Sequence, residues 1–216
     1  MVQKSEKEPL PARRSRGRPR SFDAGATLAQ ATLTFWQRGY AATSMDDLSE
    51  ATGLNRPSLY GAFGDKHALY LQALRLYAEQ SDAAIAAAFE GCPLRDGLAR
   101  VYALALQLYY PADATPRGCL LIGTAATEAP RDEAIRAALA AALHGFTAAF
   151  EARLREAVVQ GELPAGTDVA MRAQLAAAVL HSMALRARAG EPREALAALA
   201  QAGVAMVLSP TGTAAR

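Results

Sequence analysis

Apolar residues recur at helical spacing along most of the chain, and almost no stretch alternates between apolar and polar positions as a strand would. The first apolar stripe covers residues 22–39 and ends at a glycine, and shorter stripes follow over 44–53 and 57–64. The pattern predicts three helices. Because Phe35 and Trp36 are adjacent in the first helix, we expect that they cannot both point inward and that one of them packs against the following fourth helix.

Polar residues stand where the second and third helices begin. Ser44 and Asp47 have the spacing of a capping box, with Asp in place of Glu. Paired carboxylates can serve in acid–base catalysis, but we interpret Asp46 and Asp47 as residues that stabilise the first turn of the second helix. Asn55 is the expected N-cap of the third helix, and Pro57 begins that helix because proline lacks the N–H that a first turn leaves unpaired.

The rest of the chain also predicts helices. Asp65 caps a long fourth helix. Clusters of glycine and proline separate the later apolar stripes, so we expect further helices near 94–110, 118–127, 131–160, 167–189 and 192–208. Larger apolar residues interrupt the alanine repeats at helical spacing, which favours closely packed helices over a low-complexity chain. The predicted fold class is all-α.

Charge is distributed unevenly along the chain. The 216 residues are 51% hydrophobic, enough for a substantial core, and carry a formal net charge of +2. Residues 1–20 alone hold seven basic and two acidic side chains, so the remainder is slightly acidic. We expect residues 1–21, which also contain three prolines, to form a flexible basic arm for a polyanionic partner. A tail that only aids solubility explains the charge equally well.

The second and third predicted helices, joined by a tight turn that contains glycine, form a helix-turn-helix. In that motif the second helix of the pair lies in the DNA major groove, with its N-terminal residues at the base edges. Arg56 can donate two parallel hydrogen bonds to guanine, and Ser58 can bond to a base or a phosphate. The Tyr60 hydroxyl and the Lys66 ammonium are expected to reach the DNA backbone.

Further residues extend the predicted DNA contact. The hydroxyl groups at the start of the second helix are placed to donate to phosphates, and arginines of the basic arm are spaced to follow the narrow minor groove. The residues predicted to contact DNA are Arg18, Arg20, Thr43, Ser44, Asn55, Arg56, Pro57, Ser58, Tyr60 and Lys66. Helix-turn-helix geometry also occurs in proteins that bind no nucleic acid, so the arm adds weight to the prediction.

The stretch GYAATSMDDLSEATGLNRPSLYGAFGDKHALY resembles the DNA-binding domain of the TetR family, bacterial repressors controlled by small ligands. The resemblance is dense over residues 22–70 and looser over the helical remainder, where RGCLLIGTAATEAP at 117–130 resembles a segment of one broad branch of the family. The chain departs from the family pattern at Pro57, Gly61 and Ala62, which leaves the operator sequence open.

The resemblance implies an organisation and a function. It implies an N-terminal three-helix helix-turn-helix DNA-binding domain plus a C-terminal helical domain for ligand binding and dimerisation. The expected boundaries are 1–21 for the basic arm, 22–66 for the DNA-binding domain, 67–210 for the effector-binding and dimerisation domain and 211–216 for a tail. The expected partners are double-stranded operator DNA with a palindromic sequence, a second copy of the chain and a small-molecule effector, and the effector spreads the two reading heads.

An effector pocket is expected among the C-terminal helices, and helical spacing brings several aromatic and polar residues to shared faces. The candidate ligand-binding residues are Tyr102, Leu106, Tyr109, Tyr110, Cys119, His144, Phe146, Phe150, His181 and Met183. Core packing explains the same spacings, so we expect about half of them to be ordinary core residues. Neither His144 nor His181 has metal-ligand spacing with another His or Cys, and no metal site is predicted.

Cys119 has two interpretations. A position at a helix start beside Arg117 would lower the pKa of its thiol and favour a sensor of electrophiles or oxidants. The alternative is a small buried apolar residue, which is the usual environment of a free cysteine. Cys119 and Cys92 are too few for a disulfide framework. With no secretion signal and no apolar run long enough to cross a membrane, we expect a cytoplasmic protein.

Other function classes have little support in the sequence. It shows no nucleophile–base pair, phosphate loop or metal cluster, so an enzyme is not predicted and no cofactor is expected. An enzyme would have to use His144 or His181 without a visible partner. A helical scaffold or ligand carrier that does not bind DNA remains the alternative, but the basic arm and the polar face of the third helix count against it. The sequence therefore predicts a ligand-responsive DNA-binding regulator, a repressor released by a small molecule or an electrophile.

Overall fold

The structure is a computed structural model that describes residues 22–112 and 115–209, and every regular element in those ranges is helical. The elements are α1 (Ala24–Arg38), α2 (Met45–Thr52), α3 (Arg56–Phe63), α4 (Lys66–Phe89), α5 (Leu94–Tyr109), the π-helical turn η1 (Leu121–Ala125), α6 (Ala126–Glu128), α7 (Glu133–Val159), α8 (Val169–Arg188) and α9 (Arg193–Leu208). The predicted all-α fold class is confirmed.

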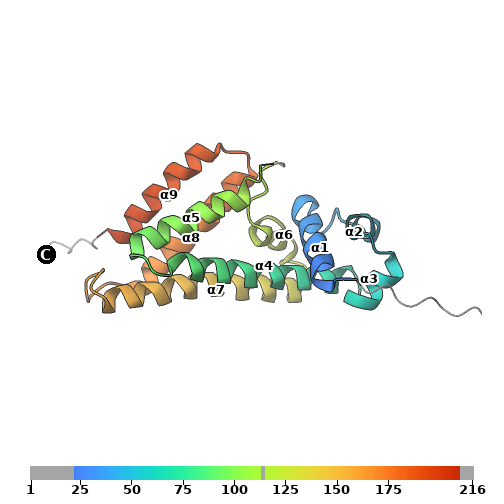
Figure 1. Ribbon diagram of the computed structural model, residues 1–216, viewed down its shortest axis with the longest axis horizontal. Helices are drawn as coiled ribbons and strands as arrows, with labels where there is room; N and C mark the ends of the chain where they lie inside the picture. Colours follow the sequence, from blue (N-terminus) through green and yellow to red (C-terminus); the bar gives the residue numbers. More distant parts are fainter. Residues whose placement is uncertain (1–21, 113–114, 210–216) are drawn as a thin grey trace, which may run out of the picture.

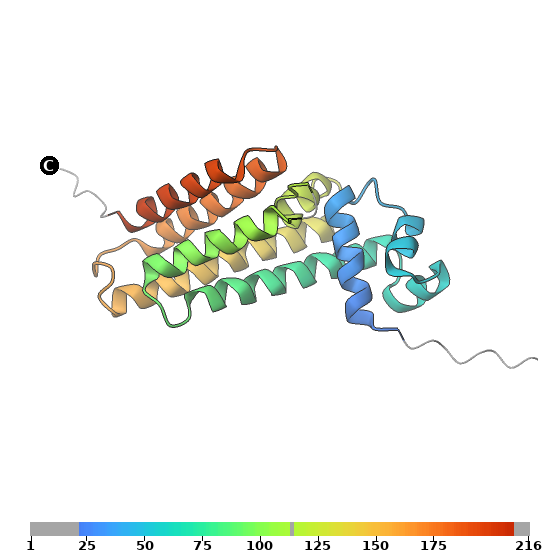
Figure 2. The same cartoon turned by 45° about the horizontal axis from the view of Figure 1, so that its top comes forward.

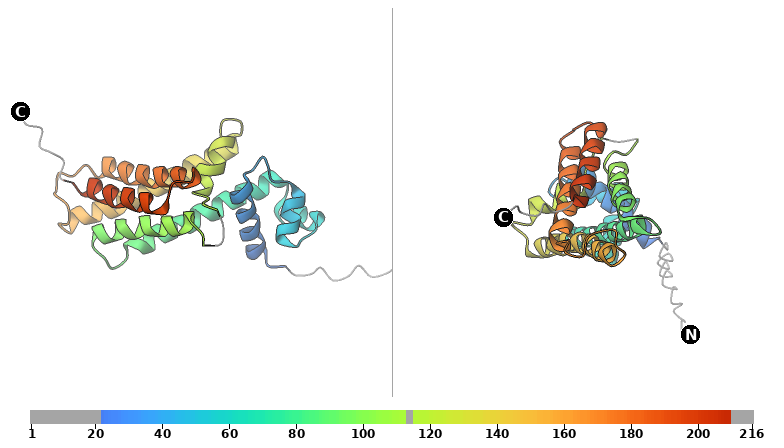
Figure 3. Two further views of the ribbon diagram at one scale, coloured as in Figure 1. Left: turned by 90° about the horizontal axis from the view of Figure 1, so that it is seen from above. Right: turned by 90° about the vertical axis from the view of Figure 1, so that its left-hand side faces the viewer.

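The molecule is elongated, with α1, α2 and α3 gathered at one end (Figure 1). We call these three helices the head and α5–α9 the body. The long helix α4 starts beside α3 and runs into the body, where it packs against α5 and α7 (Figure 2). Within the body, helices α8 and α9 lie side by side (Figure 3). Because α4 packs on both α1 and α7, a single helix spans head and body.

Acidic and amide side chains fix where helices begin. Asn55 and Asp65 cap α3 and α4 as predicted, each accepting a hydrogen bond from a backbone N–H of the first turn. Helix α3 begins at Arg56, so Pro57 is its second residue rather than its first. The cap of α1, which the sequence reasoning missed, is Asp23, whose carboxylate accepts from two backbone N–H groups.

Helix α1 is covered on two sides, and this corrects the expectation that only one of Phe35 and Trp36 points inward. Phe35 has no exposed surface and Trp36 is 6% exposed. The Phe35 ring meets the Tyr70 ring edge-on at a centroid distance of 4.9 Å, and Trp36 meets Tyr77 in the same way at 4.9 Å. Residues 117–125, which we call the junction segment, cover α1 on its second side.

Two hydrogen bonds attach the junction segment to the head and to α4. The Trp36 indole N–H donates to the Gly118 carbonyl oxygen at 3.0 Å in a buried position. The hydroxyl oxygens of Tyr70 and Thr124 lie 2.6 Å apart, also buried. Gly118 has a φ of +62°, and a Cβ atom added there would lie 2.2 Å from the Ala184 carbonyl oxygen of α8. Only glycine therefore fits the place where head, junction segment and body meet.

We expect Gly118→Ala to destabilise the protein by about 1 to 3 kcal/mol more than Gly161→Ala. Both glycines have positive φ, at +62° and +76°, so both variants share the strain of a left-handed alanine. Only the alanine at position 118 would also overlap another backbone, because Gly161 has nothing within 4 Å of its added Cβ. Chemical denaturation followed by circular dichroism measures the difference, and equal losses would contradict the packing at Gly118.

Candidate nucleic-acid interface and ligand cavity

Helix α3 is held by one face and leaves the other open. Leu59 and Phe63 are buried in the core of the head. On the opposite face Arg56 and Pro57 are exposed, and Tyr60 is 48% exposed although it is large and aromatic. The half-buried Ser58 and the small exposed residues Gly61 and Ala62 complete this open face, which has few large side chains. The side chain of Asn55 caps α3, since its carbonyl oxygen accepts from the Ser58 N–H at 2.9 Å.

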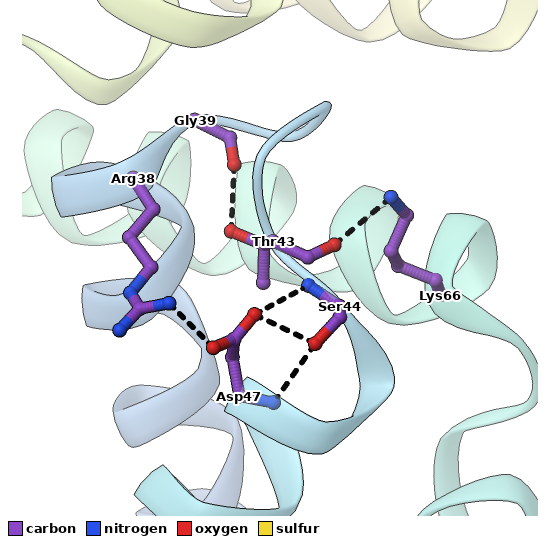
Figure 4. Close-up of polar contacts among 6 residues, drawn as sticks. All are labelled: Arg38, Gly39, Thr43, Ser44, Asp47 and Lys66. Atoms are coloured by element: carbon purple, nitrogen blue, oxygen red, sulfur yellow. Dashed lines mark hydrogen bonds and ion pairs between the residues drawn. The ribbon is translucent and has the colours of Figure 1, made fainter.

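The start of α2 is locked by the network shown in Figure 4. The backbone N–H and the hydroxyl of Ser44 both donate to one carboxylate oxygen of Asp47, at 2.8 and 2.7 Å. The Asp47 N–H donates back to the Ser44 hydroxyl, which completes the predicted capping box. The other Asp47 oxygen accepts from Arg38. These bonds, those from Ser44 first, lower the pKa of the Asp47 carboxyl and keep it ionised at neutral pH.

The predicted phosphate contacts of Thr43 and Ser44 need correction. Thr43 is only 1% exposed, and its hydroxyl donates to the Gly39 carbonyl at 2.6 Å. The Ser44 hydroxyl is exposed, but its proton is directed to Asp47. In this structure neither hydroxyl is a free donor, because both are used to form the turn between α1 and α2.

Lys66 is placed differently from the expected exposed phosphate contact. Its ammonium donates to the carbonyl oxygens of Tyr40 and Thr43, at 3.1 and 3.0 Å, and lies 4.3 Å from the centre of the Tyr40 ring. The first residue of α4 thus holds the loop that leads into α2. An ammonium has three N–H donors, so one remains for a further partner.

Arg56 carries the exposed positive charge of α3, and its guanidinium forms two hydrogen bonds with the carboxylate of Asp46 on α2. The pair is open to solvent, with 53% of the Arg56 side chain and 70% of the Asp46 side chain exposed. The hydrogen bond from Arg56 is the main cause that lowers the pKa of the Asp46 carboxyl. The arginine that was predicted to read a base is thus paired with a carboxylate of the neighbouring helix. The predicted contacts of Arg18 and Arg20 lie outside the described residues.

A cavity of about 420 Å³ lies between α4 and the body, a volume suited to a small organic ligand. Its wall is mostly apolar, with a few polar side chains from α4, α5 and the junction segment. The lining residues are Tyr77, Ser81, Ala84, Ile85, Val101, Leu104, Ala105, Gln107, Leu108, Tyr109, Arg117, Cys119, Phe146 and Leu180. Burial raises the pKa of the Tyr77 and Tyr109 hydroxyls well above the ordinary value, so both remain neutral at physiological pH.

Three of the ten predicted ligand-binding residues line the cavity, namely Tyr109, Cys119 and Phe146. Helix α5 faces the cavity with Val101, Leu104, Ala105 and Leu108, whereas the predicted residues Tyr102 and Leu106 lie on the neighbouring face. The Tyr102 hydroxyl donates to the Ala176 carbonyl of α8 at 3.1 Å, and the Tyr110 hydroxyl donates to the Glu191 carbonyl. Leu106, Phe150 and Met183 are buried core residues.

Neither predicted histidine lines the cavity. His144 is exposed on α7, which corrects its assignment as a ligand-binding residue. The His181 ring lies behind the cavity wall, with its centroid 6.4 Å from that of Phe146. Burial lowers the pKa of His181, and among the described residues its Nε2 atom has no hydrogen-bond partner. His181 is therefore a neutral group next to the cavity at physiological pH.

Of the two interpretations of Cys119, the structure favours the small buried residue over the thiol with a lowered pKa. The residue is 4% exposed, and burial is the largest influence on it and raises its pKa above the ordinary value. A hydrogen bond from Tyr77 acts in the opposite direction but is the weaker influence. The guanidinium of Arg117 lies 4.1 Å from the centre of the Trp36 ring. Cys119 is thus a buried, neutral part of the cavity wall.

Several site residues were missed by the sequence reasoning. Tyr77 and Ser81 of α4 supply polar groups to the cavity, but their helical spacing did not indicate which side of α4 would face it. The Arg56–Asp46 pair joins residues ten positions apart on two helices, a spacing without a sequence signal. In the described ranges no cluster of three or more His, Cys, Asp or Glu side chains is placed to hold a metal, and no helix is long and apolar enough to cross a membrane.

Comparison with known proteins gives matches along most of the chain. Residues 28–73 match the family model for bacterial regulatory proteins of the tetR family, and residues 97–202 match that for a tetracyclin repressor-like C-terminal domain. The HTH-type transcriptional repressor ComR of Escherichia coli K12 is 33% identical over 190 residues, which covers 87% of this chain and 90% of ComR.

Solved structures agree with these matches. The TetR family transcriptional regulator CifR, carrying three cysteine substitutions and complexed with 26-bp double-strand operator DNA, has a TM-score of 0.79 and 35% identity. This match covers 87% of the present chain and 98% of the CifR chain. A second CifR variant complexed with operator DNA has a TM-score of 0.79 and 36% identity over the same shares.

We expect alkylation of Cys119 to be slower in the native protein than in the unfolded chain, and to keep rising with pH beyond the point where the unfolded chain levels off. Burial raises the native thiol pKa, so a smaller fraction is thiolate at any pH below that value. Iodoacetamide labelling between pH 7 and 10, followed by peptide mass spectrometry, measures both curves. A native curve that levels off at a lower pH would show a lowered pKa and restore the sensor interpretation.

Proposed function

The chain belongs to the TetR family of bacterial regulatory proteins, and we propose that it binds a palindromic operator as a homodimer and represses transcription until a small-molecule effector releases it. The observation that carries the DNA-binding part is the open polar face of α3, anchored from behind by Leu59 and Phe63. Operator DNA is present in the CifR structures that resemble this chain. The expected setting is the cytoplasm, where the DNA lies.

The proposed contacts differ in what they read. Arg56 and Ser58 reach base edges in the major groove, where an arginine can form two hydrogen bonds with guanine. Tyr60 donates its hydroxyl to the DNA backbone, and the low surface at Gly61 lets α3 approach closely. Lys66 contributes mainly by holding the loop before α2, with one donor left for a phosphate. The basic arm, with Arg18 and Arg20, is proposed to enter the adjacent minor groove.

The proposed homodimer pairs α8 and α9 with the same helices of a second copy. Three large apolar side chains, Met171, Leu185 and Met206, are exposed on these two helices. Exposed apolar residues of this size on neighbouring helices favour burial against a partner. Two copies would present two α3 helices, and a palindromic operator matches that twofold symmetry.

The proposed route from the cavity to the head runs through the junction segment. Arg117 and Cys119 line the cavity, and between them lies Gly118, whose carbonyl accepts the Trp36 N–H of α1. A ligand that displaces either neighbour shifts this carbonyl, and the head must follow or lose a buried hydrogen bond. The bond between Tyr70 and Thr124 couples the same segment to α4.

We expect specific, salt-dependent retardation of the intergenic DNA beside the chain's own gene. Each phosphate contact releases counterions, so log Kd should change steeply and linearly with log salt concentration. Deleting residues 1–20 should weaken binding and flatten the slope, because it removes seven basic side chains. The measurement is an electrophoretic titration at several salt concentrations against a shuffled duplex. Equal affinity for both duplexes, or none, would favour the ligand carrier that does not bind DNA.

We expect Ala105→Phe to weaken operator binding by about tenfold, because the new ring fills the cavity as an effector would. Ala103→Phe is the matched control, since Ala103 is exposed on the same helix and does not line the cavity. In a Trp36→Phe background the loss of operator affinity caused by Ala105→Phe should be smaller. Phenylalanine keeps an aromatic ring at position 36 but lacks the N–H that donates to the Gly118 carbonyl. Operator Kd values and circular dichroism measure binding and folding, and equal effects of both phenylalanines would contradict the route.

A further inference from the structure

The two consecutive carboxylates at the start of α2 do different work. Asp47 turns back to cap its own helix and to meet Arg38 of α1. Asp46 reaches across to α3 and accepts two hydrogen bonds from Arg56, one from Nε and one from Nη2. The capping box fixes the backbone of the first turn, and with it the position from which Asp46 extends. The Asp46–Arg56 contact therefore joins the two helices of the helix-turn-helix on the open side of α3.

This ion pair is not needed to hold the two helices together. Most of both side chains is exposed, at 53% for Arg56 and 70% for Asp46, and exposed ion pairs contribute little to stability. The helices are already joined through the core of the head, where Leu48 of α2 and Leu59 of α3 have no exposed surface. Because ordering two exposed side chains costs conformational entropy, we look for a role of the Asp46–Arg56 pair other than stability.

The pair leaves one edge of the guanidinium available in a defined direction. A guanidinium is planar and carries five N–H donors in a rigid fork. Asp46 occupies the edge formed by Nε and Nη2, so the edge formed by Nη1 and Nη2 is the one left for another acceptor pair. Guanine presents such a pair, N7 and O6, in the major groove. An arginine already fixed in orientation loses less conformational freedom on binding.

We propose that Asp46 is a positioning residue that orients the guanidinium of Arg56 toward one guanine of the operator, so that the pair, rather than Arg56 alone, sets selectivity at that base pair. The inference rests on the proposed DNA-binding function and names the determinant of its specificity. Asp46 brings a negative charge to a surface that faces phosphates, which lowers affinity for DNA in general. A carboxylate at this place thus favours selectivity over total affinity.

The test compares base discrimination in Asp46→Asn, Arg56→Ala and the double variant. The full-length wild-type protein first selects its preferred duplex from a randomised library, and Kd is then measured for that duplex and all its single-base variants. Arg56→Ala should lose discrimination at one base pair. Asp46→Asn should lose discrimination at the same base pair by about tenfold, and the double variant should lose no more than Arg56→Ala.

Glu50→Gln is the matched control, because it removes one exposed negative charge from the same helix and the described residues give Glu50 no ion pair. It should raise affinity for all duplexes alike and leave discrimination unchanged. The four variants should melt at temperatures similar to that of the wild-type protein, since Asp46, Arg56 and Glu50 are all exposed. Asp46→Asn behaving as Glu50→Gln does, or losing discrimination at a different base pair, would overturn the inference while leaving the proposed function intact. A wild-type protein that selects no sequence would overturn both.

Discussion

The hydrogen bond from the Trp36 indole to the Gly118 carbonyl is the constraint on which the relation between head and body depends. Both groups are buried, and leaving such a donor unpaired costs about 1–3 kcal/mol. Around the bond, Arg117 covers the outer face of the indole and Tyr77 meets it edge-on. Gly118 in turn lies against the backbone of α8 at Ala184. A shift of α1, of α8 or of the cavity wall therefore changes the same few contacts.

In the head, side chains that donate to backbone carbonyl oxygens hold the loop between α1 and α2. Thr43 donates to Gly39, and Lys66 donates to Tyr40 and Thr43, so one loop is tied to both α1 and α4. These bonds use donors that were predicted to contact DNA, and they hold the loop that leads into α2. The open face of α3 remains available because Leu59, on the opposite face of the helix, is buried in the core of the head.

Local interactions were predictable from the sequence, and distant ones were not. Helix caps such as Asn55 act within three residues, so the order and approximate ends of most helices could be read from the chain. The single helix predicted near 118–127 is instead the π-helical turn η1 followed by the short helix α6. The cavity face of α5 could not, because Val101 and Tyr102 are adjacent and both faces are apolar, one lining the cavity and one packing on α8. The position of Thr43 depends on Lys66, 23 residues away.

Four carboxylates of the head, or at its boundary, lie beside groups that offset their negative charge. Asp23 and Asp65 lie at helix N-termini and accept from backbone N–H groups, where the helix dipole offsets negative charge. Asp47 faces Arg38, and Asp46 faces Arg56. The hydrogen bond from Arg56 lowers the pKa of the Asp46 carboxyl, and hydrogen bonds from Ser44 first, then Arg38, lower the pKa of the Asp47 carboxyl. Both carboxyls therefore lose their charge only at a lower pH than an ordinary aspartate. Each of these four carboxylates thus has a local partner. Because Arg38 and Arg56 are two of those partners, the carboxylates of Asp47 and Asp46 also orient these two guanidinium groups.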